Sequence, residues 1–159
     1  MTINRYWQSL VLALTLQLTF PATASMEHDA MVHNANARAT FAMATTAAVY
    51  LTVMNHGDSA LTLTSVSVAD EIAGEAQIHT TVMEGDMMKM RQVTAGIDIE
   101  PGAMVEFKPG GYHVMLMGLV NPLEKGNKFS LTLHFADATT KTVEIGVGAE
   151  GSQGGHHHH

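Results

Sequence analysis

The sequence contains no cysteine among its 159 residues. It can therefore form no disulfide, and it cannot build a blue-copper centre or a cysteine-ligated zinc site, because both need a thiolate. The soft ligand that remains is the thioether of methionine, and the chain has 12 methionines and 10 histidines. Methionine usually serves as flexible core filler, but its sulfur also favours Cu(I) over harder divalent ions.

Basic residues are also scarce. Lysine and arginine total eight against 15 acidic residues, and the formal net charge is −7. Because a nucleic acid or an anionic membrane needs a basic face on its partner, we expect neither as a partner. Hydrophobic residues nevertheless make up 46% of the chain, which is enough for one packed domain of ordinary size.

The first 24 residues have the pattern of an export signal. Arg5 gives a positive start, residues 10–20 form a mostly apolar run, and residues 21–24 supply small residues before a cleavage site. The run is shorter than the roughly 20 residues that a membrane-spanning helix needs, so a retained anchor is the less favoured alternative. We therefore predict that residues 1–24 are a signal peptide and that the protein is periplasmic. No later stretch is apolar enough over a sufficient length to span a membrane.

Residues 25–36 are polar, lack a regular apolar period and are predicted to be a flexible arm. An auxiliary copper site could form there from four side chains: Met26, His28, Met31 and His33. Cleavage after Ser25 would make His28 the third residue of the mature chain, a spacing that suits Cu(II) at the amino terminus. The alternative is an unstructured solubilising arm. Residues 149–159 are a glycine- and histidine-rich tail, either a native metal-attracting segment or a purification tag.

Residues 37–148 have the pattern of short strands separated by turns. Apolar side chains alternate with polar ones in segments at 47–53, 61–68, 97–99, 105–107, 129–135 and 143–147. The alternation changes parity between Leu63 and Val66, which predicts a bulge near Thr64 and Ser65. No helical period is present. The pattern predicts a single all-β domain, an antiparallel sandwich or barrel.

A hairpin is predicted where residues 77–83 and 88–93 flank a four-residue loop at 84–87. Met83 then pairs with Met88, and continued pairing sets Thr81 opposite Met90. His79, two residues before Thr81, shares its face, so His79 and Met90 become diagonal neighbours whose Cα atoms lie about 7–8 Å apart. Two long side chains at that separation can meet on one ion. A slip of one residue would send Met90 to the other face.

A second histidine–methionine pair follows the glycine turn at residues 110–111. His113 and Met115 are separated by one strand residue, so they point the same way at the rim of the sheet. Val114 and Leu116 are expected to face the core, and Met117 is a spare ligand or a packing residue. Each pair alone is a weak signal. Two such pairs without any cysteine predict a Cu(I) site of His79, Met90, His113 and Met115.

These residues resemble the periplasmic copper chaperone family known as PCu(A)C, whose signature is H-x10-M-x21-H-x-M. Ten residues separate His79 from Met90, and His113-x-Met115 matches the end of the signature. The spacing from Met90 to His113 is 22 residues, so this chain has one residue more than the family signature between these two positions. The resemblance extends from the segment near residues 37–51 over nearly the whole mature domain.

The resemblance implies a cupredoxin-like Greek-key β-sandwich that binds one Cu(I). It also implies delivery of copper towards the binuclear copper site of cytochrome c oxidase subunit II, often beside a Sco-type thiol protein. A periplasmic copper buffer without a dedicated acceptor and a plain interaction module are the alternatives. No recognisable catalytic arrangement is present, so we expect a monomeric carrier and no enzyme.

Overall fold

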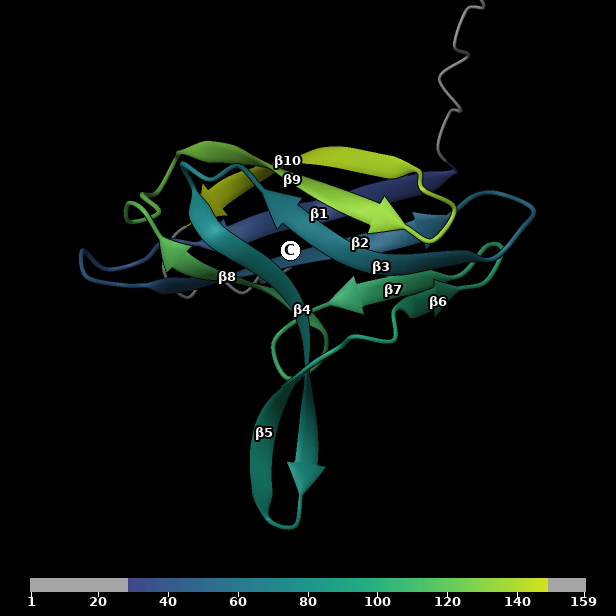
Figure 1. Ribbon diagram of the computed structural model, residues 1–159, viewed down its shortest axis with the longest axis horizontal. Coiled ribbons are helices and arrows are strands. Elements are labelled where there is room, and N and C mark those ends of the chain that lie inside the picture. The colour runs from purple at the N-terminus through teal and green to yellow at the C-terminus, as the bar shows by residue number, and fades with distance from the viewer. Residues whose placement is uncertain (1–28, 149–159) are drawn as a thin grey trace, which may run out of the picture.

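The computed structural model describes residues 29–148, which form the all-β domain in Figure 1. Within this range lie ten strands: β1 (Ala30–Arg38), β2 (Thr46–Asn55), β3 (Leu61–Val68), β4 (Ala73–Glu84), β5 (Met87–Gln92), β6 (Ile97–Ile99), β7 (Met104–Phe107), β8 (His113–Leu119), β9 (Lys128–Phe135) and β10 (Thr140–Gly148). No helix in residues 29–148 is long and apolar enough to cross a membrane. The predicted signal peptide and the tail lie outside the described residues.

The strands follow one hydrogen-bonded path in the order β5-β4-β8-β2-β1-β10-β9-β3-β6. Strand β7 is off this path and pairs with residues 51–54 of β2, next to residues 46–49 of β2, which pair with β8. The two halves of this path pack against each other, because side chains from both halves belong to one buried cluster. The predicted cupredoxin-like β-sandwich is confirmed. All strand pairs are antiparallel except β1 with β10, which run parallel.

The predicted alternation is confirmed in the strands that build this core. In β2 the buried positions include Val49, Leu51 and Val53, and in β8 Val114 and Leu116 are fully buried. The bulge predicted near Thr64 and Ser65 is also present, as a register shift between Leu63 and Ser65 where β3 pairs with β9. The parity change in the sequence therefore marks a true irregularity in the sheet.

The prediction of a flexible arm is wrong for residues 30–36, which form most of β1. Backbone pairing holds this strand on both sides, because residues 30–37 pair with β2 and residues 36–38 pair with β10. Only Ala30 and Ala37 of the strand are buried. The register shifts between His33 and Asn36, and Asn34 has a positive φ of 54° at that point. The strand thereby joins the two halves of the sandwich.

The β4–β5 hairpin leaves the body of the sandwich and extends away from it (Figure 1). From here on, the arm means this hairpin, residues 79–92, and not the amino-terminal segment. Its register is the predicted one, with Met83 opposite Met88 and Thr81 opposite Met90. The loop is shorter than predicted, because Glu84 and Met87 also pair and only Gly85 and Asp86 remain in the turn. Gly85 has a φ of 63°, a left-handed conformation that a two-residue hairpin turn requires and that glycine adopts without strain.

Candidate metal centre

Two histidines lie side by side where the arm joins the body. His79 on β4 is the register partner of His113 on β8, and their ring centroids are 5.9 Å apart. The rings are tilted by 57°, so they are not stacked face to face. Residues 78 and 114, the neighbours on the opposite face, are buried in the core. The core packing of Ile78 and Val114 therefore fixes the strands and turns both imidazoles to the outer face.

Each imidazole has one nitrogen with a partner and one without. His79 Nε2 is 2.9 Å from Gln77 Oε1, and His113 Nδ1 is 3.1 Å from the Gly111 carbonyl oxygen. Because both partners are acceptors, these ring nitrogens carry the protons and donate. The opposite nitrogens, His79 Nδ1 and His113 Nε2, are buried and have no hydrogen-bond partner. Both therefore present a lone pair, the form of imidazole that binds a metal.

Partial burial favours the neutral form of His79. Desolvation lowers the pKa of His79 below its ordinary value, and the nearby His113 lowers that pKa further by charge repulsion. His113 itself is only 4% exposed, although its place after the glycine turn predicts an accessible rim position. A buried polar nitrogen without a partner is costly, so the pair is poised for a ligand that accepts both lone pairs.

Met90 shares the outer face with the two histidines. It pairs with Thr81, two residues from His79, so it is the diagonal neighbour of His79 on the arm side. Its side chain is 61% exposed. The structure thus places Met90 on the same face of the sheet as both rings. The predicted hairpin register, which makes Met90 a diagonal neighbour of His79, is confirmed.

Met115 lies on the other flank of His79. It pairs with Gln77, which makes Met115 a diagonal neighbour of His79 across β4 and β8. Met117 continues the same face opposite Glu75, one step further from the rings. Both methionines are partly buried. The four predicted ligands therefore share one face, with Met90 and Met115 placed towards opposite ends of β4 around the histidine pair.

Two residues of the site are missing from the sequence prediction. Gln77 and the Gly111 carbonyl each orient an imidazole that lies two positions later in the chain. For Gln77 a signal exists, because residues two apart on a strand share a face. The Gly111 carbonyl has no side-chain signal, and only the turn geometry places it at the ring.

The auxiliary site is not assembled within the described residues. Met31 and His33 are both exposed on β1, opposite Met54 and Thr52, whereas Met26 and His28 lie outside the described range. Residues 29–148 contain no group of three or more histidine, aspartate or glutamate side chains that could hold a metal.

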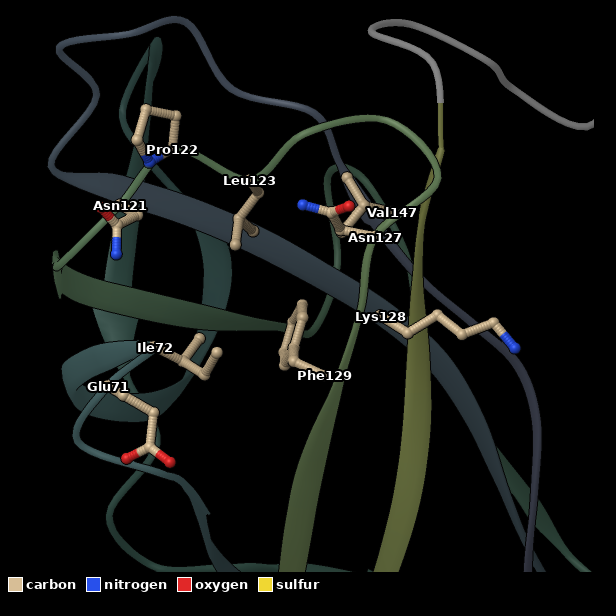
Figure 2. Close-up of a pocket in the computed structure, with 9 residues that line it drawn as sticks. All are labelled: Glu71, Ile72, Asn121, Pro122, Leu123, Asn127, Lys128, Phe129 and Val147. Atoms are coloured by element: carbon tan, nitrogen blue, oxygen red, sulfur yellow. The ribbon is translucent and has the colours of Figure 1, made fainter.

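The pocket in Figure 2 lies elsewhere in the domain. Its lining is Glu71, Ile72, Asn121, Pro122, Leu123, Asn127, Lys128, Phe129 and Val147, and none of the predicted ligands belongs to it. Lys128 Nζ is 2.6 Å from Glu144 Oε1, so its charge is directed to an ion pair on the adjacent strand. What faces the pocket is mostly the apolar side chains of Ile72, Leu123 and Phe129. It offers no metal ligand set.

Comparison with known proteins agrees with this fold. The family described as "Putative lipoprotein LpqE-like" matches residues 30–147. A protein of Leifsonia xyli subsp. xyli with a lipoprotein name is 39% identical over 82 residues, covering 52% of this chain and 49% of that protein. An uncharacterized protein of Rickettsia prowazekii is 34% identical over 100 residues, covering 63% and 54%. The chain spans about half the length of the curated relatives it matches.

Several solved structures share this architecture, and two of them are copper-bound forms. The Cu(I) form of DR1885 from Deinococcus radiodurans has a TM-score of 0.58 and 26% identity, covering 80% of this chain and 83% of that chain. The copper-bound PCuAC domain from PmoF2 has a TM-score of 0.60 over 76% of this chain and 93% of that domain. Its identity is 24%, so this second likeness shows the fold alone.

The fold and the site together define a cupredoxin-like β-domain with imidazole and thioether side chains on one outer face. The chain belongs to the LpqE-like family, whose structural neighbours are the PCuAC copper chaperone domains.

Proposed function

We propose that this protein is a periplasmic Cu(I) carrier that holds one ion with His79, Met90, His113 and Met115. The observation that supports it most directly is the pair of adjacent imidazoles, each with a buried nitrogen that lacks a partner. Family membership supports the same cargo, because the related structures include copper-bound forms. The lipoprotein names of the family and of the Leifsonia relative support export.

The ligand set suits a carrier. Neutral imidazoles and thioethers bring no negative charge to the ion, so Cu(I) is held without the permanence of a thiolate site. Met90 is largely exposed, whereas His113 is buried. An acceptor can therefore displace the outer thioether first and the imidazoles afterwards, exchanging one ligand at a time. No catalytic role is part of the proposal.

The proposed acceptor is a copper protein of the same compartment, either a Sco-type thiol protein or subunit II of cytochrome c oxidase at its binuclear copper site. Thiolates bind Cu(I) more strongly than thioethers do, so transfer to such a site is downhill. The resemblance to PCu(A)C chaperones supports this direction of transfer.

Growth with little copper tests the delivery role. Deletion of the gene should lower cytochrome c oxidase activity, and a plasmid copy carrying His113→Ala with Met115→Ala should fail to restore it. The wild-type copy and a His56→Ala copy, altered at an exposed turn outside the site, should both restore it. If oxidase activity is unchanged and only tolerance to excess copper falls, the protein is a buffer and the delivery role is wrong.

A further inference from the structure

The outer end of the arm exposes more methionine than the proposed carrier site uses. Met83 and Met88 are direct partners across the hairpin, and Met90 follows Met88 on the same face. The three side chains are 65%, 66% and 61% exposed. Partners on antiparallel strands have Cβ atoms about 4.5–5.5 Å apart, and diagonal neighbours such as Met83 and Met90 stay within reach of long side chains. Three thioethers can therefore converge above this face.

The arm separates three of its four exposed thioethers from most of its charge. Glu84 forms ion pairs with Lys89 and Arg91, and these residues occupy the face opposite the three methionines. The backbone pairing of the hairpin runs from His79 and Gln92 to Glu84 and Met87, and neither Met83 nor Met88 belongs to the core. The methionine face is left with neutral sulfur ligands and Thr81.

Core packing does not account for these methionines. The buried cluster of the domain contains neither Met83 nor Met88, and neither is among the partly buried side chains packed against it. Exposed apolar side chains gathered on one face commonly mark a binding surface. Sulfur is what distinguishes this face from an ordinary apolar one, and soft thioethers select Cu(I).

We propose that the arm carries a second Cu(I) site, formed by Met83 and Met88 with Met90 as the third thioether. The inference rests on the proposed function, because the cargo is the same ion. Met90 belongs to both sites, since it is diagonal to Met83 on one side and to His79 on the other. An ion bound at the exposed end of the arm can thus pass to the histidine pair by exchange of one thioether at a time.

The test is an anaerobic Cu(I) titration of the full chain against a competing chelator, in a His79→Ala, His113→Ala background that removes the imidazoles. The residual binding should include one equivalent with sulfur ligands in X-ray absorption spectra. Adding Met83→Leu with Met88→Leu should abolish that equivalent, because leucine keeps the apolar volume but has no sulfur. Met87→Leu, an exposed methionine on the opposite face, is the matched control and should leave it unchanged.

The outcomes separate the two proposals. If residual binding is the same with and without Met83 and Met88, the arm site is wrong and the carrier site stands. If the unaltered chain and the His79→Ala, His113→Ala variant bind Cu(I) equally, the histidine site and with it the proposed function fail. In the chain with both histidines, Met83→Leu with Met88→Leu should leave the affinity of the carrier site unchanged but slow its loading from the chelator.

Discussion

At the residue scale, the site depends on two imidazoles, each with one ring nitrogen that donates a hydrogen bond and one that is left with a lone pair. Gln77 accepts from His79, and the Gly111 carbonyl accepts from His113, so the same spacing of two residues orients both rings. Such outer partners fix the tautomer and raise the basicity of a ligating histidine. The protein therefore prepares both lone pairs before any ion arrives.

The low pKa of His79 gives a pH prediction for the metal-free protein. Because the folded-state pKa lies below the unfolded value of about 6.5, the unfolded chain binds more protons between these two values. Stability should therefore fall as the pH drops from about 6.5 to the folded pKa and then level off. Histidine ring signals in NMR should give a His79 pKa below that of free histidine.

His113→Ala is the informative variant for this titration. It removes the neighbouring charge and part of the burial, so the His79 pKa should rise towards its ordinary value. An unchanged His79 titration in His113→Ala would show that the two rings do not interact as the structure places them.

Sequence reasoning predicts the strands and faces of the candidate ligands but not their surroundings. Strand alternation puts His113 and Met115 on one face, and the hairpin register puts His79 and Met90 on one face. The pairing of β4 with β8, which sets His79 beside His113, cannot be predicted from that spacing. The burial of His113 cannot be predicted this way, because it depends on the packing of the turn at residues 108–112 and on the neighbouring strand. Local spacing contains no information about either.

At the element scale, the register of the arm decides whether the site exists. The pairing of Thr81 with Met90 places a thioether on the histidine face, and a shift by one residue would place Arg91 there instead. The shorter turn at Gly85 and Asp86 does not alter this register, because lengthening both strands by one paired residue preserves every partner. The predicted position of Met90 therefore does not depend on whether the loop has two residues or four.

A rescue experiment tests the register. Met90→Thr should raise the Kd for Cu(I) by about tenfold or more, as expected when a ligand is removed. Adding Gln92→Met should restore much of the affinity, because residue 92 lies directly opposite His79 on the same face. Adding Arg91→Met should restore none, since that side chain points to the other face. Equal rescue by both substitutions would contradict the register.

The β1 strand shows where pattern reading fails for an element. Its core-facing residues are Ala30, Val32, Ala35 and Ala37. Their spacing changes parity across the irregularity between His33 and Asn36, so no regular apolar period marks the strand. A strand held between two others needs few apolar side chains. Backbone pairing leaves no signal in composition, which is why residues 30–36 resemble a linker.

At the scale of the whole molecule, the buried polar side chain of Asn55 links the end of β2 to β6. Asn55, at the end of β2, donates from Nδ2 to the Ile99 carbonyl at 2.8 Å and to the Ser59 carbonyl at 2.7 Å. Its Oδ1 accepts from the Gly57 amide at 2.9 Å. Because Asn55 is fully buried, these bonds replace all contact of its side chain with water.

Asn55→Ala should lower the free energy of unfolding by about 2–4 kcal/mol, because it leaves the buried Ile99 carbonyl without this donor and removes the bonds to Ser59 and Gly57. Urea denaturation measures the loss. Asn36→Ala is the matched control, since the Asn36 side chain makes one exposed bond to the Asn34 carbonyl, and it should change stability by only about 0.5 kcal/mol. Equal losses in the two variants would show that Asn55 does not link β2 to β6 energetically.

The central claim is that imidazole and thioether side chains bind the same Cu(I). X-ray absorption of the full chain with one equivalent of Cu(I), loaded without oxygen under competition from a chelator, tests it most directly. The account predicts a first shell that contains both nitrogen and sulfur, with the nitrogen contribution reduced in His79→Ala with His113→Ala. A shell of nitrogen and oxygen alone, or a spectrum unchanged by that double substitution, would contradict it.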